Sequence, residues 1–372
     1  MSSPPRYLTW LTSCVVAEHE RSSLSIRAVA WPEIGPGDDL AMLLAETAAL
    51  VVGDVVVVTS KVVSKAEGRI EKGSRAAVVD RESVRIVARR GESVIGETRH
   101  GLVMAAAGVD ASNAPEGTVV LLPVDPDRSA RRLRDRLHQQ AGVNVAVLVT
   151  DTVGRAWRNG QIDLAIGCAG MDPWHELRGT LDTHGKPLTV TAPATVDEVA
   201  SAADLVKGKT SGCPVAVVSG LGHLVHPAGQ HGPGAAALIR DSALDMFGLG
   251  TREAAVAAAL REDAVALAHF PPSTEMTDEP FVGLVSGLAG VRVISRPRVE
   301  TAGIDARNRG GWHVEVGVRD GAGVTEQRHA GALVERAKVL AVAYRLDVID
   351  DAVTSVSDHG WQTVHGFSAV SP

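Results

Sequence analysis

One segment of the chain places acidic, hydroxyl and basic side chains at the end of an apolar run. Residues 147–161 read Val-Leu-Val-Thr-Asp-Thr-Val-Gly-Arg-Ala-Trp-Arg-Asn-Gly-Gln. This pattern predicts a buried strand that ends at Asp151 and Thr152, followed by a loop that carries Arg155 and Arg158. A carboxylate and a hydroxyl offer the oxygen ligands that a phosphate-bound Mg²⁺ or Mn²⁺ prefers, and the arginines could neutralise phosphate oxygens. The simpler alternative is an N-cap aspartate followed by surface arginines.

A second acidic residue, Asp110, ends the apolar stretch of residues 105–113, Ala-Ala-Ala-Gly-Val-Asp-Ala-Ser-Asn. Two carboxylates a few ångströms apart would repel by about 4 kcal/mol at an effective dielectric constant of about 20, unless a cation lies between them. Asp110 and Asp151 are therefore either ligands of one metal site or not a pair. By itself Asp110 is typical of an Asx turn, and Asn113 favours that interpretation.

Hydroxyls and lysines follow another apolar run. Residues 55–58 are four consecutive valines, which predict a fully buried strand, and Ser60, Lys61, Ser64 and Lys65 come directly after it. Backbone N–H groups, a hydroxyl and an ammonium group at a strand-to-helix turn could form a phosphate cradle. Lysines after a strand also often form a solvated face, so both interpretations stay open.

Two other strings fail as motifs. Gly208-Lys209-Thr210 resembles the end of a P-loop, but it follows a predicted helix instead of preceding one, and Ala203 stands where the first glycine belongs. The glycine-rich loop 220–234 holds three histidines without a cysteine partner or helical spacing. This pattern favours ordinary histidines of a loop over histidines that bind a metal ion.

The elements that must position these residues alternate between strands and helices over residues 25–247, which predicts an α/β or α+β domain. Strands are expected at residues 26–29, 55–58, 119–122, 143–149 and 214–218. Helices are expected from Asp38 and Asp39 to residue 50, over residues 125–140, and from Thr195, which forms a capping box with Glu198. Residues just beyond the carboxyl ends of such strands face a ligand crevice.

The pattern of residue types changes after about residue 252. Residues 253–267 predict an alanine-rich helix and Pro271-Pro272 a linker. A separate small α/β block follows, with strands expected at 291–294 and 312–318 and a helix at 330–344. We therefore expect an N-terminal extension over residues 1–24, a first domain over 25–250 and a C-terminal block of unknown function over 271–372.

Composition limits the classes of function. Of the 372 residues, 45% are hydrophobic and 22% charged, and the net charge is −7, which excludes a disordered chain or a disulfide scaffold. Only 3% are aromatic, and with the acidic balance this argues against a nucleic-acid surface. Three dispersed cysteines and the lack of a long apolar run predict a cytoplasmic protein that does not span a membrane and acts on small molecules.

These segments, in this order, resemble the coenzyme F420-0:L-glutamate ligase (gamma-glutamyl ligase) family. The resemblance covers about residues 25–220 and includes Pro-Gly-Asp-Asp-Leu at 36–40 and Leu-Pro-Val-Asp-Pro-Asp at 122–127. It also includes Asp-Glu-Val-Ala-Ser-Ala-Ala-Asp-Leu-Val-Lys-Gly-Lys at 197–209. Its most specific part is the string Asp-Thr-x-Gly-Arg-x-Trp-Arg-x-Gly-Gln at 151–161.

The resemblance implies a CofE-like α/β (α+β) ligase domain that forms an intertwined homodimer and is not a Rossmann domain. It implies GTP-dependent addition of L-glutamate, through its amine, to the carboxylate end of the deazaflavin coenzyme precursor F420-0, by way of an acyl phosphate. Further gamma-linked glutamates could be added in the same way. GTP is the implied co-substrate, with Mg²⁺ or Mn²⁺ as the divalent ion and K⁺ as an ion that the site could also use.

The resemblance also assigns roles to individual residues. Asp110 and Asp151 would hold divalent metal, and Thr152 would contact a second ion. Lys65, Arg155 and Arg158 are the expected catalytic residues, which neutralise phosphates or hold a carboxylate. The expected contacts to GTP come from Trp31, Pro32, Glu33, Ile34, Ser60, Lys65 and Asn113.

The C-terminal block departs from two-domain relatives. Those begin a nitroreductase-like, FMN-binding domain with Arg-Arg-Ser-x-Arg-x-Phe, whereas residues 260–270 here read Leu-Arg-Glu-Asp-Ala-Val-Ala-Leu-Ala-His-Phe. About 100 residues remain after this point, too few for such a domain. FMN is therefore not expected.

Two further interpretations stay open. A metal-dependent phosphohydrolase or a nucleotide-binding protein could use the same aspartates and lysines, with water in place of the glutamate amine. The C-terminal block could be a binding or dimerisation module without chemistry of its own. Consumption of GTP that requires both glutamate and F420-0 would favour the ligase.

Overall fold

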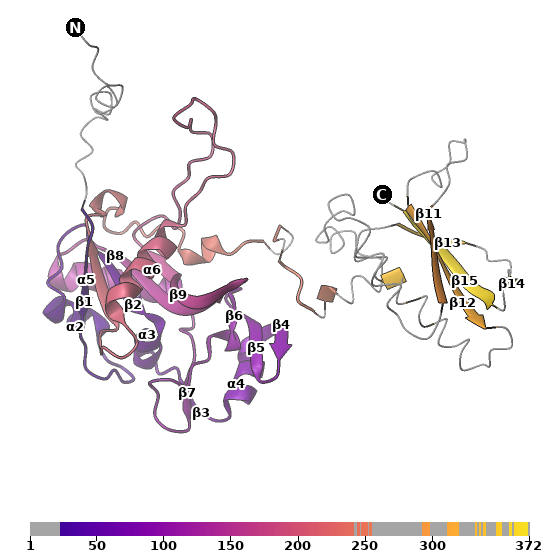
Figure 1. The fold of residues 1–372 in the computed structure, drawn as a ribbon. Coiled ribbons are helices and arrows are strands. Elements are labelled where there is room, and N and C mark those ends of the chain that lie inside the picture. Colours follow the sequence, from indigo (N-terminus) through magenta and orange to yellow (C-terminus); the bar gives the residue numbers. More distant parts are fainter. Residues whose placement is uncertain are drawn as a thin grey trace, which may run out of the picture. The chain divides into compact units, whose positions relative to one another are not determined.

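The computed structural model describes residues 23–241 without interruption and parts of the chain beyond them. The described residues beyond 241 are 244–245, 247–251, 253–254, 292–297, 311–319, 332, 335, 338–339, 347–351, 357–358 and 361–370. The chain divides into two compact units, Met1–Arg240 and Asp241–Pro372 (Figure 1). Most of the expected N-terminal extension, most of the alanine-rich helix and the linker lie outside the described residues.

A mixed five-stranded sheet forms the centre of the first unit (Figure 1). Its order is β1-β10-β2-β8-β9. The strands are β1 (Ser25–Val29), β2 (Val55–Thr59), β8 (Ala146–Arg155), β9 (Arg158–Ala169) and β10 (Val215–Ser219). Only β2 and β8 run parallel, and every other neighbouring pair in this sheet is antiparallel. The domain is therefore α+β, without the parallel, doubly wound sheet of a Rossmann domain.

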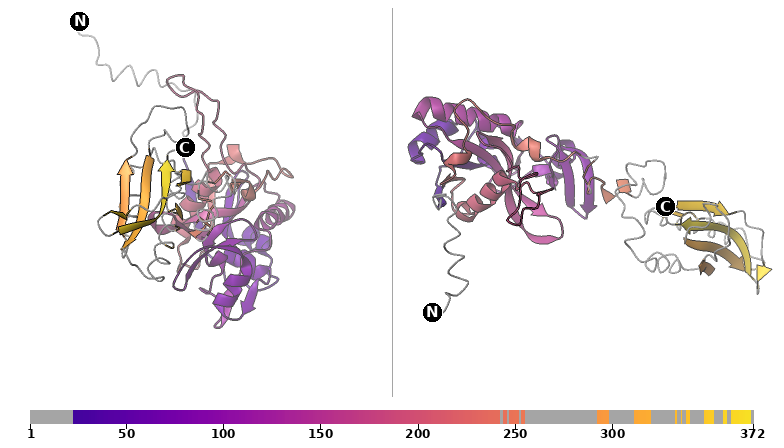
Figure 2. Two further views of the ribbon diagram at one scale, coloured as in Figure 1. Left: turned by 90° about the vertical axis from the view of Figure 1, so that its right-hand side faces the viewer. Right: turned by 90° about the horizontal axis from the view of Figure 1, so that it is seen from above.

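Helices cover both faces of the sheet, as Figure 2 shows from two further directions. α2 (Leu40–Thr47) and α5 (Pro126–Ala141) pack on one face, and α6 (Thr195–Lys207) packs on the other. The four consecutive valines of β2 alternate between these two apolar layers, and none of them is exposed to solvent. A strand covered on both faces needs an unbroken apolar run, which explains this part of the sequence.

The chain between β2 and β8 forms a smaller lobe. It holds a three-stranded antiparallel sheet, a two-stranded pairing and two short helical segments. These are β4 (Ser83–Arg90), β5 (Ser93–Thr98) and β6 (Val103–Ala105); β3 (Ile70–Lys72) and β7 (Thr118–Val120); and α4 (Arg75–Glu82) and η1 (Ala106–Gly108). A separate apolar cluster of mainly valine side chains fills this lobe.

The predicted strands and helices of the first unit are confirmed, with two corrections. The capping box is wrong, because Ala194 is the N-cap of α6, while Thr195 is already helical and donates to the Pro193 carbonyl at 3.4 Å. The predicted loop after Thr152 is also wrong. β8 continues to Arg155 and turns directly into β9, so these residues form a long antiparallel hairpin.

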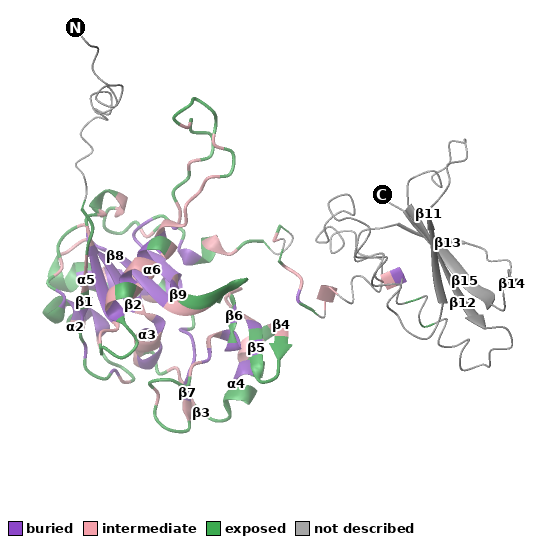
Figure 3. Ribbon diagram, in the orientation of Figure 1, coloured by how far each residue is buried: buried purple, intermediate pink, exposed green. Residues whose placement is uncertain are grey.

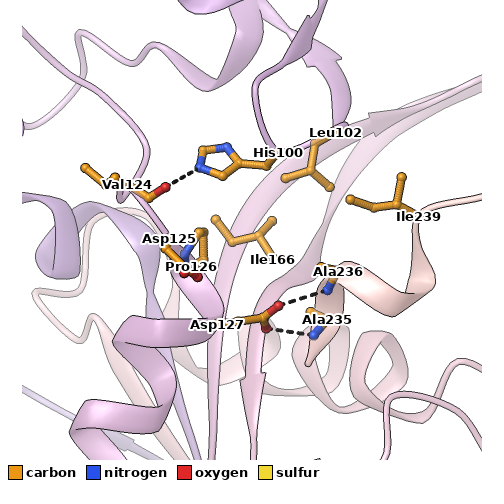
Figure 4. A pocket seen from close by; sticks show the side chains of 10 residues that line it. All are labelled: His100, Leu102, Val124, Asp125, Pro126, Asp127, Ile166, Ala235, Ala236 and Ile239. Carbon is orange, nitrogen blue, oxygen red and sulfur yellow. Dashed lines mark hydrogen bonds between the residues drawn. The ribbon is translucent and has the colours of Figure 1, made fainter. Parts of the chain in front are cut away.

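The first turn of α5 is fixed by two aspartates with different roles. Asp125 is the N-cap and accepts from the Arg128 backbone N–H at 2.9 Å. Asp127 is buried, and its carboxylate accepts three backbone N–H groups, from Cys168 at 2.7 Å, Ala235 at 2.7 Å and Ala236 at 3.1 Å. The last two contacts are drawn in Figure 4. Asp127 therefore joins α5 to β9 and to η3 (Ala235–Leu238).

A buried arginine holds the glycine-rich loop. The guanidinium of Arg134 donates to the Val145 carbonyl, the Asn144 side chain and the carbonyls of His226, Pro227 and Gln230 at 2.7–3.0 Å. His226 and His231 instead face Asp172 at 3.5 Å and Asp135 at 3.4 Å. Within the described residues, no group of three or more His, Cys, Asp or Glu side chains could hold a metal ion.

The second unit contains an antiparallel sheet in the order β11-β12-β15-β13, and β14 pairs with β15. The strands are β11 (Arg292–Pro297), β12 (Gly311–Arg319), β13 (Asp347–Asp351), β14 (Ser357–Asp358) and β15 (Trp361–Val370). The strands expected at 291–294 and 312–318 are confirmed, whereas most of the expected helix at 330–344 lies outside the described residues. No helix in the described part of the chain is long and apolar enough to cross a membrane.

We expect Asp127→Asn to lower the free energy of unfolding of the first unit by about 2–3 kcal/mol, because the amide would turn a donor toward one buried N–H group. Asp125→Asn is the matched control in the same helical turn. Asparagine caps a helix as well as aspartate does, so the control should cost less than about 0.5 kcal/mol. Hydrogen exchange of α5 in increasing denaturant measures both values, and equal losses would contradict this role for Asp127.

Candidate functional site

The predicted site residues approach one another because β2 and β8 are parallel neighbours. Thr59 at the end of β2 pairs with Thr150 of β8, so the next residues of both strands, Ser60 and Asp151, lie side by side. Ser60 begins α3 (Ser60–Ala66), which follows β2 without a loop. The parallel register thus brings the first hydroxyl of α3, that of Ser60, to the Asp151 carboxylate.

A strained turn brings Asp110 to the same place. Ala106 and Ala107 have φ values of 52° and 48°, a left-handed conformation that costs an L-residue about 1–2 kcal/mol. Two backbone hydrogen bonds hold the chain after this turn. The Asp110 N–H donates to the Val120 carbonyl at 3.0 Å, and the Val120 N–H donates to the Asp110 carbonyl at 2.8 Å. The tertiary pairing therefore stabilises a backbone that the local sequence disfavours.

The Asp110 carboxylate forms the expected Asx turn and also an ion pair. It accepts from Ser112 backbone N–H at 2.7 Å, which confirms the Asx turn, and from the Ser112 hydroxyl at 2.9 Å. It also forms an ion pair with Lys61 of α3, whose Nζ lies 2.6 Å from Oδ2. The turn residue is thus also part of the charged cluster.

The two carboxyl groups are shifted in opposite directions. Burial raises the pKa of Asp151 to about 6; the Thr152 backbone and the Ser60 side chain oppose this shift, while the Asp163 and Asp110 carboxylates add to it. Burial also acts to raise the pKa of Asp110, but the hydrogen bonds and charge of Lys61 and the Ser112 turn outweigh it and lower the pKa. Burial and the neighbouring carboxylates therefore favour the neutral form of Asp151.

Thr152 lies between an acid and a base. Its hydroxyl donates to Asp163 Oδ1 at 2.8 Å and accepts from Lys209 Nζ at 2.8 Å. Asp163 is directly opposite Thr152 in the hairpin and is buried together with Lys207, whose Nζ lies 2.6 Å from Asp163 Oδ2. The string Gly208-Lys209-Thr210 follows α6, so it is no P-loop, but its lysine does reach the cluster.

The segment Trp31–Ile34 approaches the cluster through one side chain. Glu33 forms an ion pair with Lys65, which is buried, while Glu33 itself is exposed. The Trp31 and Ile34 side chains belong to the apolar core, and the Trp31 indole N–H donates to Thr47 Oγ1 at 3.1 Å. These two residues can therefore offer a ligand their backbone, whereas Pro32 and Glu33 are exposed.

Three other candidate residues lie at the margin. Asn113 is exposed three residues after Asp110 and has a φ of 52°. Arg155 and Arg158 lie at the outer end of the β8–β9 hairpin, where Arg155 Nη2 donates to the Asn159 carbonyl at 3.0 Å. Arg155 follows Asp151 by four positions, a distance of about 13 Å along the strand. The fold of one chain does not bring these arginines to the carboxylates.

The donor set fits a divalent ion that is bound together with phosphate. Asp110, Asp151 and the Thr152 hydroxyl are hard oxygen ligands, and water or phosphate oxygens can complete the coordination of an ion held by two carboxylates. Mg²⁺ is commonly held by one or two carboxylates plus substrate phosphates and water, which matches this count. The raised pKa of Asp151 shows that added positive charge would be favourable there.

The charged cluster comprises four carboxylates and four lysines: Asp110, Asp151, Asp163 and Glu33, and Lys61, Lys65, Lys207 and Lys209. Three of the carboxylates are each paired with one lysine, whereas Asp151 is next to Ser60, Thr152 and two other carboxylates. Sequence reasoning missed Asp163, Lys207 and Lys209. Asp163 did carry a signal, because a carboxylate within the apolar strand Ile162–Ala169 requires a buried partner.

Two cavities lie outside this cluster. One, of about 210 Å³, is lined by His100, Leu102, Ile239 and the start of α5, and Figure 4 shows that the Asp127 carboxylate beside it is turned toward backbone N–H groups. The other, of about 430 Å³, lies between Trp174 and the loop that holds His223. Neither is lined by a candidate residue of the charged cluster.

Comparison with known proteins agrees with this arrangement. The family model for F420-0:gamma-glutamyl ligase matches residues 28–220, which include all the carboxylates and lysines of the cluster. A coenzyme F420:L-glutamate ligase of Methanopyrus kandleri is 44% identical over 210 residues, which are 51% of this chain and 83% of that protein.

Two further relatives with the same name extend the match. The protein of Haloarcula marismortui is 37% identical over 248 residues, 60% of this chain and 94% of the relative. That of Methanothermobacter thermautotrophicus is 34% identical over 244 residues, 58% of this chain and 95% of the relative. Because the match covers half of the chain and nearly the whole of these relatives, the chain belongs to the F420-0:gamma-glutamyl ligase family of enzymes.

Proposed function

We propose that this protein is a GTP- and metal-dependent ligase that joins L-glutamate to F420-0 and could extend the product by further gamma-linked glutamates. The observation that carries the proposal is the Asp110–Asp151 pair, which lies where β2 ends beside β8, with Lys61 paired to Asp110 and the two carboxyl pKa values shifted in opposite directions. The relatives are named for ligation of L-glutamate to coenzyme F420, which suggests the substrates. The free Cys168 and Cys213 are in keeping with a cytoplasmic location.

The α3 side chains are suited to the phosphates of GTP. Lys61 and Lys65 lie one turn apart on one face of the helix, and Ser60 and Ser64 share the neighbouring face. The Ser64 hydroxyl is buried and has no hydrogen-bond partner within the described structure. A phosphate oxygen near these groups would find both a donor hydroxyl and two ammonium charges.

The metal would be held by Asp110, Asp151 and Thr152, and when bound it would supply positive charge to the phosphate oxygens. Lys61 would then be available to a phosphate, because the metal ion would compensate the negative charge of Asp110 together with Lys61. Lys65, paired with the exposed Glu33, is in a similar position. The nucleotide segment Trp31–Ile34 and Asn113 would contact the rest of GTP through backbone and exposed groups.

The chemistry is a phosphoryl transfer followed by an acyl transfer. The terminal carboxylate of F420-0 attacks the γ-phosphorus of GTP, the bond to the bridging oxygen breaks, and GDP leaves. The glutamate amine then attacks the acyl carbon, loses a proton, and inorganic phosphate departs as the amide forms. Lys61, Lys65 and Lys209 would stabilise the charge on the transferred group throughout.

A hydrolase could use the same residues, with water as the nucleophile, but nothing in the site favours water over an amine. The named relatives are ligases. We therefore expect wild-type protein with GTP, Mn²⁺, glutamate and F420-0 to increase the mass of F420-0 by one or more glutamyl residues. GTP consumption without glutamate would contradict ligation.

Asp151→Asn should reduce this ligation by at least about 100-fold, because the metal loses a charged ligand. The variant remains folded, since an uncharged amide is easier to bury than the carboxylate whose pKa is raised. Its melting temperature without metal at pH 8 should equal or exceed that of the wild type. Mass spectrometry and thermal melting test both statements, and near-normal ligation would contradict the metal role.

Metal affinity should depend on pH through Asp151. Below a pKa of about 6, a proton occupies this carboxylate and must leave when metal binds, so affinity falls as the pH falls. Asp110 has a lowered pKa and stays ionised in the same range. Between pH 7.5 and pH 5 the affinity for Mn²⁺, measured by electron paramagnetic resonance, should drop about tenfold. A flat profile would contradict this assignment.

Homodimer formation and the two hairpin arginines belong to the same proposal. Much of the outer part of the β8–β9 hairpin is exposed (Figure 3). Trp157, between the two strands, is 82% exposed. Leu181 and Val190, in the segment between β9 and α6, are 67% and 84% exposed. Such apolar side chains are suited to a partner surface. In a dimer, Arg155 and Arg158 would serve the carboxylates of the other subunit.

Co-expression of Asp151→Asn and Arg158→Ala chains tests this arrangement. Each variant alone should be nearly inactive. If the arginine acts across the dimer, half of the dimers are mixed and each contains one intact composite site, so about a quarter of the wild-type ligation returns. Mixed chains that remain as inactive as the separate variants would show that Arg158 serves its own subunit or none.

A further inference from the structure

A buried ion pair lies directly behind Thr152 and has no role in the reaction described so far. Asp163 and Lys207 are each about 3% exposed. Asp163 Oδ2 accepts from Lys207 Nζ at 2.6 Å and from the Thr150 hydroxyl at 3.0 Å, while Oδ1 accepts from Thr152. A buried charged pair is weak support for stability by itself, because both groups lose their hydration. Its geometry therefore calls for another explanation.

The hydrogen-bond partners of the Thr152 hydroxyl determine the direction in which its proton points. A hydroxyl has one proton to donate and two lone pairs. An ionised carboxylate only accepts and an ammonium group only donates, so the Thr152 proton must point to Asp163 and one lone pair must face Lys209. The second lone pair is left for a further partner. Thr150 is fixed in the same way, since it donates to Asp163 and accepts from Lys207 at 2.9 Å.

The same pair determines where Lys209 lies. Lys207 is the last residue of α6, and its ammonium group is attached to β9 through Asp163. Lys209 follows two residues later, after Gly208, and reaches the Thr152 hydroxyl at 2.8 Å. Attachment of the helix end thus sets the start of the segment that carries Lys209.

We propose that Asp163 and Lys207 are positioning residues for the ligase reaction: they turn the free lone pair of the Thr152 hydroxyl toward the divalent ion that Thr152 would ligate, and they hold Lys209 beside that hydroxyl. The inference rests on the proposed function, because that function gives Thr152 a metal ion to bind. It extends that function to residues that touch neither substrate nor metal. Carboxylates that orient a ligand in this manner change metal affinity by about 10–100-fold when removed.

The test removes both charges together, because a single change would leave one buried charge unpaired and could unfold the protein. Asp163→Asn with Lys207→Met should preserve the circular dichroism spectrum. Its affinity for Mn²⁺, measured by electron paramagnetic resonance at pH 8, should fall about tenfold or more. The kcat of ligation should fall as well, whereas the KM for glutamate should not change.

A double-mutant cycle with Thr152→Val separates positioning from a general structural effect. If the pair acts through the Thr152 hydroxyl, its removal in the Thr152→Val background should change Mn²⁺ affinity by less than about twofold. An equally large loss in both backgrounds would overturn the proposal. Unchanged Mn²⁺ affinity in the paired variant with Thr152 present would overturn it as well.

Asp197→Asn is the matched control on the same helix. The Asp197 carboxylate is partly buried between α6 and β9 and accepts from Ala165 backbone N–H at 3.0 Å, but it has no contact with Thr152. This variant should keep the wild-type Mn²⁺ affinity. The Mn²⁺ measurements need neither GTP nor F420-0, so a failure to detect ligation would count against the proposed function and leave this test intact.

Discussion

The need to balance negative charge at the ends of β2 and β8 governs this part of the molecule. The parallel register of these strands brings Asp151 beside α3, and a strained turn adds Asp110 from the smaller lobe. Carboxylates this close are tolerated only when cations lie among them. Lys61 balances Asp110, whereas Asp151 remains undercompensated, with a pKa raised to about 6. The fold thus keeps one carboxylate ready for an additional positive charge.

The scaffold is rigid where the site requires it. The unbroken valine run of β2 is buried on both faces, and Asp127 and Arg134 attach α5 to the neighbouring loops through backbone groups. Strands that are packed on both sides cannot shift register without exposing their apolar faces. The positions of Ser60 and Asp151 relative to each other are therefore set by the core rather than by their own contacts.

The β8–β9 hairpin shows how one sequence motif can serve separate tasks. Its inner part supplies Asp151 and Thr152, and Asp163 stands opposite Thr152 on the returning strand. Its outer part carries the half-buried Arg155 and the exposed Trp157 and Arg158. A loop, as the sequence suggested, would have allowed the arginines to fold back onto the carboxylates. The paired strands prevent this, which makes the arginines candidates for a neighbouring subunit.

The sequence by itself determined most elements of the central sheet and some of the acidic and basic residues of the site, Asp110, Asp151, Lys61 and Lys65. Apolar periodicity located the strands, and the spacing around Asp110 and Asp151 pointed to phosphate and metal. Only the tertiary structure decided which residues meet. Asp163 is joined to Lys207 across 44 residues of sequence, and Lys209 to Thr152 across 57. Local pattern cannot encode such contacts, because they arise when strand pairing and helix packing are satisfied together.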